Sequence, residues 1–573
     1  MHRAILLLFG WLSSFACFAQ AEADALKDLI VLCYHDVREA LPVTRDDYVL
    51  EAGELVNQFA WLKEHGYTVV SLQQVVAARA GKERLPHKPV LLTFDDGYRS
   101  FYTHVYPLLR LFEYPALLAL VGRWLEEPEV GRLNAPAHSP LLSWDEVRVL
   151  AESGLVEVAS HSHDLHHGIH ANPQGNELAA ATTRLYDPGA KRYESDADYA
   201  QRIRSDLMRG AELIERRTGV RPRAIVWPYG SYNATTRRLA SDAGMAISLG
   251  LDDVVPLAQP PGLHLGRNLI VGNPSLRQFA EELLRPYKPD PVRAVRVDLD
   301  KVFDPDAAQQ EAKLSRLLDR IAAMGINTVY LRASADVDGD GATDAVYFPS
   351  QHLPVRADLF GRVSWQLHTR SGVRVFAWLP TRGIRWPNER ATSGVNDEQR
   401  ARRRVVELYQ ELARHAPFDG LLFDEGGNAD DDREAPAFSQ ELLRAVEVFR
   451  PAPRTARAIP LSSLLTEAGA RESAAAFSRL RGQYDQLVLR ASQRIVLNKA
   501  RSRQLARTVA KAPAGKAALV VELDGAEPAI DRTLHALQLQ GIADLAFAPD
   551  DFLHDRPALE AVRPVVSLQS RPR

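Results

Sequence analysis

Two adjacent aspartates, Asp95 and Asp96, end the apolar run VLLTFDDGY. Neighbouring side chains on a strand point to opposite faces, so the two carboxylates are expected to have different roles. A second polar tract, SHSHDLHHG, supplies His161 and His166 after the apolar run LVEVAS. One carboxylate and two imidazoles can bind a divalent metal with positions left open for water, an arrangement common in hydrolases. The other carboxylate can then take a proton from the attacking water.

Two further polar motifs follow apolar runs: His35 in YHDV, and Trp227 and Tyr229 in WPYG. Each motif alone has an ordinary structural explanation, because Asp-Asp-Gly is usually a turn and a lone histidine is usually satisfied by backbone. Trp-Pro-Tyr-Gly alone is usually a rigid turn. Four such motifs, each at the end of a strand in one domain, are improbable as independent turns. The sequence therefore predicts one shared site.

Alternating strands and helices between residues 29 and 280 must position these motifs. Runs rich in Val, Ile and Leu predict buried strands: LIVLCYHDV, YTVVSL, PVLLTFDDGY, PALLAL, LVEVASHSH, RAIVWPYG and HLGRNLIVG. Segments with helical periodicity separate them. This alternation predicts a parallel sheet, and about seven strands favour a deformed barrel whose carboxyl-terminal rim holds the site.

The second half of the chain repeats the alternation after the proline-rich stretch RPYKPDPVR. VRAVRVDLD, INTVYLRAS and FDGLLFDE are among its predicted strands. We therefore predict an α/β protein with two barrel-type domains, the first at residues 22–284 and a TIM-like second at residues 293–573. Residues 285–292 are the predicted linker.

Residues 1–21 have the order of a secretory signal peptide: a charged start, the apolar run AILLLFGWL and a final Ala-Gln-Ala. Cleavage after Ala21 would leave Cys33 as a single cysteine, which cannot form an internal disulfide. Lipidation at Cys17 is the alternative, although the residues before it make a poor lipobox. The expected location is the periplasm, with association with the outer membrane as a second option.

Charge and composition exclude some partners. The formal net charge is −3, from 70 Lys and Arg against 73 Asp and Glu. Nucleic-acid binding normally needs a basic stripe that neutralises phosphates, so no nucleic acid partner is expected. A neutral or weakly cationic substrate fits this charge better, and we expect a monomer.

TFDDGY, SHSHDLHH and WPYG, in this order, resemble the motifs of the NodB-type polysaccharide deacetylases, carbohydrate esterase family four. YHDV and a second domain carrying VDLD, YFPSQHLPVRADLF and FDGLLFDE resemble the periplasmic poly-β-1,6-N-acetyl-D-glucosamine N-deacetylases of biofilm systems. The resemblance covers nearly the whole mature chain. It implies de-N-acetylation of a β-1,6-linked N-acetylglucosamine polymer for export and biofilm formation, with an outer-membrane export porin as a candidate partner.

The resemblance also implies a role for each polar motif. It gives three ligands for one divalent metal ion: Asp96, His161 and His166. Asp95 would be the general base. His163 and His167 in the same tract are alternatives for the second imidazole. Two imidazoles and one carboxylate suit zinc, iron, cobalt or nickel, so the metal stays open.

Three departures from the family pattern bear on the chemistry. The two histidine ligands are five residues apart, where many members have four. Trp227 stands where an arginine often orients the base, so the sequence predicts an unsupported base and modest catalytic efficiency. The matching candidate for the general acid is His35, with His264 of a loosely matched Leu-x-His motif in reserve. Trp227 and Tyr229 are expected to contact the substrate.

The second domain offers carboxylates and an aromatic side chain at predicted strand ends: Asp298, Asp300, Trp378, Asp424 and Glu425. Such a set suits a sugar-binding groove, and glycoside hydrolysis needs two carboxylic acids. The sequence predicts that this domain binds the polymer, with an acidic rim that attracts glucosammonium groups, and leaves cleavage open. Asp336–Gly341 resembles the start of a calcium loop, but Tyr347 stands where a bidentate Glu is required, so we interpret it as a turn.

Two other functions stay open. A deacetylase of peptidoglycan or chitin-like oligomers would use the same chemistry in a different groove, although the second domain argues against a minimal peptidoglycan enzyme. A carbohydrate-binding protein without catalysis would have no need for a base beside a metal site, which argues against that reading.

Overall fold

The computed structural model describes residues 26–42, 46–134, 140–252, 262–284, 290–387, 395–424, 435–461, 479–491, 499–511 and 517–569. The predicted signal segment, Cys17 and Glu425 lie outside these ranges. Contacts divide the chain into two compact units: residues 1–169, 178–185 and 193–288, and residues 170–177, 186–192 and 289–573. No helix within the described ranges is long and apolar enough to cross a membrane.

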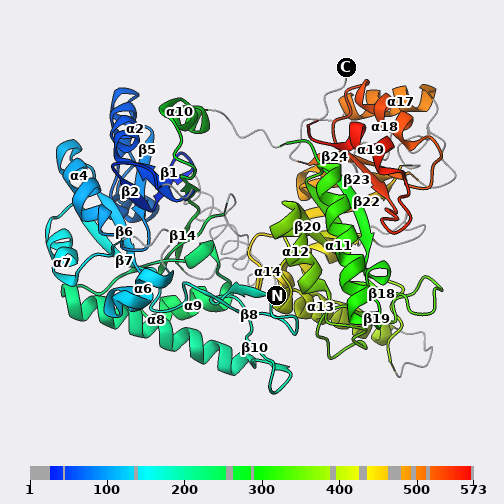
Figure 1. The fold of residues 1–573 in the computed structure, drawn as a ribbon, viewed down its shortest axis with the longest axis horizontal. Coiled ribbons are helices and arrows are strands. Elements are labelled where there is room, and N and C mark those ends of the chain that lie inside the picture. The colour runs from blue at the N-terminus through cyan, green and yellow to red at the C-terminus, as the bar shows by residue number, and fades with distance from the viewer. Residues whose placement is uncertain are drawn as a thin grey trace, which may run out of the picture. The chain divides into compact units, whose positions relative to one another are not determined.

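The first unit is built on a parallel sheet of nine strands (Figure 1). From one edge to the other, eight of them are β14 (Leu263–Leu265), β13 (Ile247–Leu249), β12 (Ala224–Val226), β7 (Val156–Ser160), β6 (Ala116–Leu120), β5 (Pro89–Phe94), β1 (Ile30–Tyr34) and β15 (Asn268–Leu269). The ninth, β4 (Thr68–Val69), pairs with β5. The sheet has two strands more than the seven predicted, because HLGRNLIVG divides into β14 and β15 and because β13 was not predicted.

The sheet curls until its two edges nearly meet. β14 forms one edge and β15 the other, yet only Gly266 and Arg267 separate them in the chain. A link this short spans roughly 10 Å even when fully extended, so the edges must lie close together. A side chain at Gly266 would meet the carbonyl oxygen of Asp252 at 2.1 Å, which explains the glycine at this closure.

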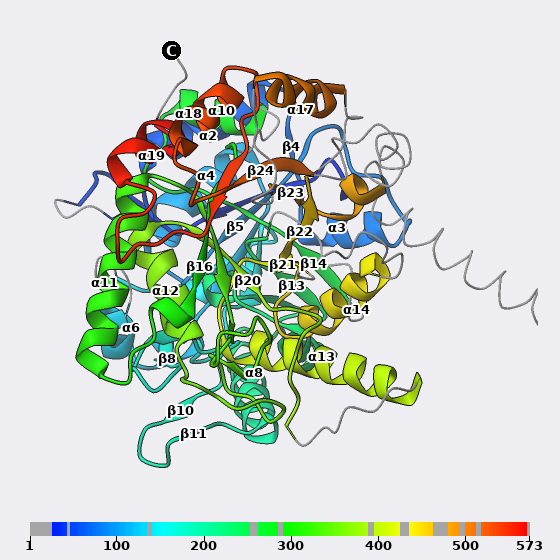
Figure 2. The ribbon, with the colours of Figure 1, turned by 90° about the vertical axis from the view of Figure 1, so that its right-hand side faces the viewer.

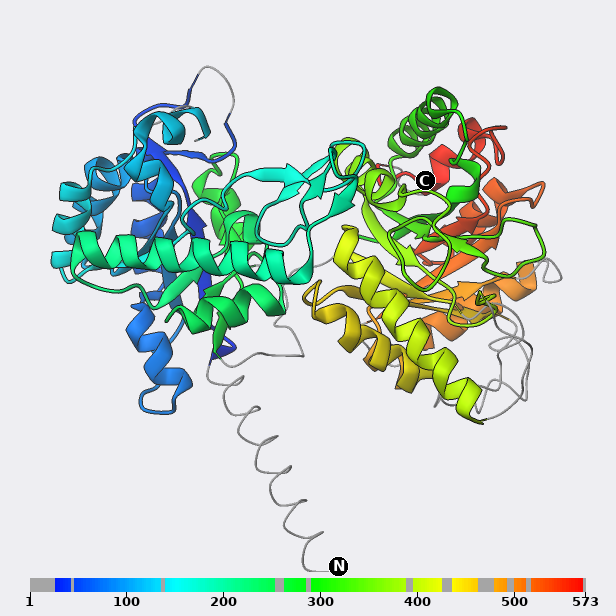
Figure 3. The ribbon, with the colours of Figure 1, turned by 90° about the horizontal axis from the view of Figure 1, so that it is seen from below.

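Helices cover this curled sheet, most of them on its outer face, whereas Leu72 and Val75 of one helix belong to the apolar cluster around Leu91 on the enclosed face. The helices are α2 (Ala52–Glu64), α3 (Leu72–Arg79), α4 (Tyr106–Phe112), α5 (Gly122–Glu126), α6 (Pro128–Asn134), α7 (Trp144–Glu152), α8 (Asp196–Thr218), α9 (Ala234–Asp242) and α10 (Leu276–Leu284). All six side chains of β5 are buried, because helices cover one face and the curl encloses the other. The longest helix of the unit, α8, begins after the N-cap Ser195 and ends at Gly219, whose φ of 77° is left-handed (Figure 3).

The second unit contains a closed barrel of eight parallel strands. In order they are β16 (Arg293–Asp298), β17 (Thr328–Arg332), β20 (Arg374–Trp378), β21 (Gly420–Phe423), β22 (Arg454–Pro460), β23 (Gln486–Arg490), β24 (Ala518–Asp524) and β25 (Leu545–Ala548). Figure 2 shows helices around the outside of these strands: α11 (Ala307–Met324), α12 (Phe360–Ser371), α13 (Val395–His415), α14 (Ala435–Glu447), α17 (Lys499–Lys511), α18 (Ile530–Gln538) and α19 (Leu559–Val566). The predicted fold class, a deformed barrel followed by a TIM-like barrel, is confirmed.

Candidate active site

The predicted polar motifs meet at the carboxyl-terminal rim of the first sheet. His35 follows β1, Asp95 follows β5, His161 follows β7 and Trp227 follows β12. These strands are parallel members of one curled sheet, so their carboxyl ends share one rim.

Asp96, His161 and His166 form a compact set of ligand atoms. Oδ1 of Asp96 lies 3.5 Å from Nε2 of His161 and 3.3 Å from Nε2 of His166. The three ligand atoms lie within 4.8 Å of one another. Oδ1 is buried and makes no well-formed hydrogen bond within the described residues, where His166 is its ion-pair partner, and such an oxygen suits an ion or water. The donor set fits a divalent metal.

His161 is held in the tautomer that a metal ligand needs. Its Nδ1 lies 2.7 Å from the carbonyl oxygen of Val226, which can only accept, so Nδ1 carries the proton and Nε2 keeps its lone pair. Burial lowers the pKa of His161 to about 4, so the imidazole is neutral near pH 7.

Asp96 and His166 each stabilise the charged form of the other. Burial raises the pKa of Asp96, but His166, His35 and His161 lower it by more, so the carboxyl is ionised. Burial lowers the pKa of His166, but the Asp96 carboxylate raises it by more, so the net pKa lies above the ordinary value. A metal at this site would therefore compete with a proton for His166.

The alternation of side chains along a strand predicted that the two aspartates point to opposite faces, and this prediction is wrong. β5 ends at Phe94, so Asp95 and Asp96 lie beyond the regular strand. Asp96 has a φ of 76°, a left-handed conformation that aspartate tolerates, and Gly97 continues the turn with a φ of 84°. The turn brings both carboxylates near His161, whose Nε2 is also 4.0 Å from Oδ2 of Asp95.

Asp95 has a partner that the sequence did not reveal. Nη1 of Arg267 lies 2.8 and 2.9 Å from the two oxygens of Asp95, and both side chains are buried. Burial raises the pKa of Asp95, but Arg267, His161 and His35 together lower it below its ordinary value. The predicted unsupported base is therefore wrong, because Arg267 orients it and keeps it ionised.

Arg267 lies far from Asp95 in the sequence and outside the predicted polar motifs. It sits between β14 and β15, where the two edges of the curled sheet approach each other. The one available signal was a lone arginine inside the apolar run HLGRNLIVG, because a buried arginine must be paired.

The two candidates for the general acid differ in their surroundings. Nε2 of His35 lies 4.0 Å from Oδ2 of Asp95, and its side chain is 13% exposed. His264 is fully buried, with Nε2 3.0 Å from Asp252 and Nδ1 3.2 Å from Ser248. Both nitrogens of His264 are engaged, so the geometry favours His35.

Trp227 and Tyr229 take different positions although both belong to WPYG. Trp227 is fully buried, and its Nε1–H donates to Oγ of Ser248 at 2.7 Å. The expectation that Trp227 contacts substrate is wrong for this reason. Tyr229 is 54% exposed and its ring lies 4.6 Å from that of His166, so it is placed to contact a sugar beside the ligand set.

The second barrel has its own polar layer at the carboxyl ends of its strands. One inward-facing layer is apolar: Ala294, Tyr330, Phe376, Leu422, Val488 and Val520. Two residues further along the same strands, where side chains again face inward, stand Arg296, Arg332, Trp378, Asp424, Arg490 and Glu522. Trp378 and Asp424 were predicted, whereas the arginines and Glu522 were not.

Arginines neutralise the buried carboxylates of this layer. Nε of Arg296 lies 2.6 Å from Glu522, and Nη1 of the same guanidinium donates to Asp424. Arg490 also donates to Asp424, at 2.8 Å. Arg296, Asp424 and Glu522 are each at most 5% exposed.

The remaining predicted acids are paired in the same way. Asp298 lies 3.0 Å from Arg332, and Asp300 lies 2.6 Å from Arg356. The guanidinium groups of Arg296 and Arg332 also lie 4.9 and 5.6 Å from the ring centre of Trp378. The expected acidic rim is therefore wrong for the described residues, because each acid is offset by an arginine.

The stretch that resembles a calcium loop consists of bends, and its side chains Asp336, Asp338 and Asp340 lie close enough together to hold a cation. Asp336 accepts the backbone N–H groups of Gly339 and Gly341. Arg385 forms ion pairs with the neighbouring carboxylates, with Nη1 2.8 Å from Asp338.

Comparisons with known families match both units. A polysaccharide deacetylase model matches residues 82–248, and a model described as hypothetical glycosyl hydrolase family 13 matches residues 296–398. The chain is 33% identical to the poly-β-1,6-N-acetyl-D-glucosamine N-deacetylase of Escherichia coli strain K12, covering 94% of this chain and 92% of that protein. It is 22% identical to the enzyme of that name from Staphylococcus epidermidis, over 44% of this chain and 82% of that protein.

Two solved domains from Bordetella bronchiseptica are also similar. The BpsB deacetylase domain is 42% identical and covers 42% of this chain and 95% of its own, with a TM-score of 0.37. The PgaB (BpsB) glycoside hydrolase domain is 28% identical and covers 49% of this chain and 100% of its own, with a TM-score of 0.43.

Proposed function

This chain belongs to the poly-β-1,6-N-acetyl-D-glucosamine N-deacetylase family of polysaccharide deacetylases, and we propose that it deacetylates a β-1,6-linked N-acetylglucosamine polymer with one divalent metal ion. One observation carries the metal dependence. Buried Oδ1 of Asp96 faces two imidazole nitrogens beside the carboxylate of Asp95, which Arg267 supports.

The metal would be held by Asp96, His161 and His166. When bound, a divalent ion polarises the acetamide carbonyl and lowers the pKa of the attacking water. The preset tautomer of His161 and the ionised carboxylate of Asp96 prepare the site for that ion.

Asp95 would act as the general base in the hydrolysis. It is ionised near pH 7 because Arg267 holds its pKa low, and Arg267 also fixes the direction of its oxygens. The carboxylate takes a proton from water as the water oxygen bonds to the acetyl carbon.

His35 would act as the general acid. Its Nε2 lies 4.0 Å from Oδ2 of Asp95, and proton transfer to the sugar nitrogen lets the C–N bond break. The products are acetate and a free amino group on the sugar. Exposed Tyr229 would hold the sugar ring against the site.

The second domain is glycosyl hydrolase-like, and we propose that it binds the polymer at the Trp378 end of its barrel. Its paired charges suit a neutral sugar, for which Trp378 offers a stacking face and the arginines offer donors. Cleavage would be shown if this chain shortened the deacetylated polymer and if the Asp424→Asn variant did not.

The cellular role is part of the same proposal. We propose that the enzyme works in the periplasm, with association with the outer membrane as a second option. There it would prepare polymer for export through an outer-membrane porin and for biofilm formation. The signal-like order of residues 1–21 supports export. Fractionation of producing cells tests the location, and loss of biofilm polymer on deletion tests the role.

Acetate release from three substrates tests the reaction and separates the alternatives. We expect acetate from the β-1,6-linked polymer and little from β-1,4-linked chitin oligomers or peptidoglycan. Preference for either of the latter would favour the alternative substrate class. No acetate from any of them would overturn the proposed activity.

A further inference from the structure

The segment that carries the two histidine ligands, here named the histidine loop (Ser160–His166), has an unusual set of backbone contacts. Its two central N–H groups, of His163 and Asp164, donate to the two carboxylate oxygens of Asp206 at 3.0 and 2.7 Å. Asp206 lies on α8, more than forty residues further along the chain, so the contact is tertiary.

The flanking N–H groups of the loop are held by side chains within it. Oγ of Ser160 accepts the N–H of Ser162, and Oγ of Ser162 accepts the N–H of Leu165. Every backbone donor from Ser162 to Leu165 thus bonds to a side-chain oxygen. Only Asp206 supplies such an oxygen from outside the loop.

The carbonyl side of the loop is held as well. The N–H groups of Gly122 and Arg123, at the start of α5, donate to the carbonyl oxygens of Ser162 and His163 at 3.0 and 2.8 Å. The loop is therefore fixed from two sides, by α5 and by α8.

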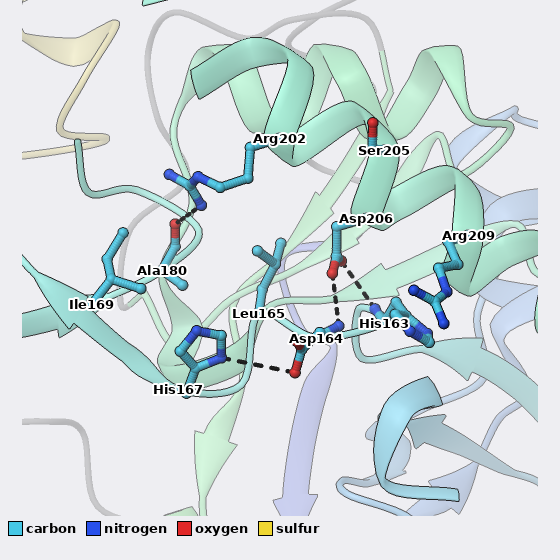
Figure 4. A pocket seen from close by; sticks show the side chains of 10 residues that line it. All are labelled: His163, Asp164, Leu165, His167, Ile169, Ala180, Arg202, Ser205, Asp206 and Arg209. Atoms are coloured by element: carbon cyan, nitrogen blue, oxygen red, sulfur yellow. Dashed lines mark hydrogen bonds and ion pairs between the residues drawn. The ribbon is translucent and has the colours of Figure 1, made fainter. Parts of the chain in front are cut away.

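Close packing of α8 makes the Asp206 contact possible. Gly210 lies one turn after Asp206 on the same face of the helix, and a side chain there would meet the backbone nitrogen of His163 at 3.1 Å. Figure 4 shows the Asp206 carboxylate pointing from α8 to the backbone of His163 and Asp164.

We propose that Asp206 is a positioning residue that fixes the conformation of the loop joining His161 to His166, which are five residues apart. A loop with one residue more than the usual spacing has more conformations, and two charge-assisted bonds to its centre remove that freedom. Asp206 touches neither imidazole, so it acts through the loop backbone. The inference rests on the proposed function, since it assigns Asp206 a part in holding the metal.

A matched control lies beside Asp206. A pocket of about 370 Å³ is lined by the loop and by α8, which contributes Ser205, Asp206 and Arg209 (Figure 4). Ser205 is exposed and accepts a hydrogen bond from Gln201 instead of the loop. Ser205→Ala therefore changes the same wall of the pocket without touching the histidine loop.

The test measures metal binding by the full-length protein, using Co²⁺ as the probe. Titrations at pH 8 keep Asp206 ionised, because burial raises its pKa only to about 7. Asp206→Asn keeps one acceptor and removes the other, whereas Asp206→Ala removes both. We expect the Co²⁺ dissociation constant to rise about 10-fold in the Asn variant and about 100-fold in the Ala variant, as is usual for groups that orient ligands.

The visible spectrum of bound Co²⁺ gives a second readout, because it changes only if the ligand geometry changes. We expect an altered spectrum for both Asp206 variants and the wild-type spectrum for Ser205→Ala. Far-ultraviolet circular dichroism confirms that each variant is folded.

Wild-type affinity and spectrum in folded Asp206→Asn and Asp206→Ala would overturn the inference and leave the proposed function intact. Failure of the wild-type protein itself to bind Co²⁺ would instead overturn the proposed metal dependence. If Asp206→Ala does not fold, Asp206→Asn alone decides between these outcomes.

Discussion

The two barrel-type units place polar side chains at the same end of their strands but neutralise them with different partners. In the first unit, Oδ1 of Asp96 faces the Nε2 atoms of two imidazoles, at 3.5 and 3.3 Å. In the second unit, Asp298, Asp300 and Asp424 each lie against an arginine.

This difference decides what each rim can bind. A neutral imidazole brings a lone pair to a cation, whereas a guanidinium brings only donors and occupies the carboxylate oxygens. The first rim therefore suits the proposed metal ion, and the second suits an uncharged polar ligand. The position of a residue at a barrel rim indicates a site, but its partners determine the chemistry.

The largest expected effect separates the two rims by activity. Asp95→Asn should lower the rate of acetate release by roughly 10²–10⁴-fold, because it removes the general base. Asp298→Asn in the second barrel should leave that rate unchanged. Equal losses in the two variants, measured on the soluble polymer, would show that the two rims act as one site.

The next largest effect concerns stability. Arg296→Met leaves Glu522 and Asp424 buried without their shared cation, so the second unit should lose about 3–5 kcal/mol of unfolding free energy. Denaturant titration measures it. Arg385→Met is the control, because Arg385 also contacts carboxylates but is 51% exposed, and about 1 kcal/mol or less is expected. Equal losses would contradict the role of burial.

A smaller effect tests the support of the base in the first rim. Asp95 is active only when ionised, so activity falls as pH drops through its pKa, which Arg267 lowers. Arg267→Gln removes the cation and leaves the burial, so the acid limb of the pH–rate profile should move to higher pH by about 1–3 units. Arg267→Lys should restore part of the shift. An unmoved acid limb would argue against Arg267 as the partner.

The smallest effect tests the neutral character of the second rim. Trp378→Ala should weaken binding of the polymer about 5- to 10-fold through loss of a stacking face, as measured by calorimetry on inactive Asp95→Asn protein. Binding should not depend strongly on ionic strength, because the described charges are paired. Steep weakening by salt would favour the acidic rim that the sequence suggested.

Local patterns were sufficient to predict the architecture and most of the first rim. Buried runs such as PVLLTF end in polar motifs, and parallel strands bring such ends together, so His35, Asp95, Asp96 and His161 could be placed near one another. β13 was missed because Ser248 divides its residues, so they do not form a continuous apolar run.

Partners from distant parts of the chain could not be predicted. Arg267 is 172 residues from Asp95, and Arg296 is 226 residues from Glu522. The burial of Trp227 likewise depends on packing that WPYG does not encode. The wrong expectations about the support of the base, Trp227 and the acidic rim concerned charge or exposure set by long-range contacts, whereas the orientation of Asp95 and Asp96 was changed by a local turn.

Metal removal followed by acetate measurement tests the central claim most directly. Enzyme stripped with a chelator and dialysed should release no acetate from the β-1,6-linked polymer, and added Zn²⁺ or Co²⁺ should restore the activity. Asp96→Asn, which lacks the ligand carboxylate, should stay inactive after the same additions. Full activity of the stripped enzyme, or of Asp96→Asn without added metal, would contradict the assignment of this rim as a metal site.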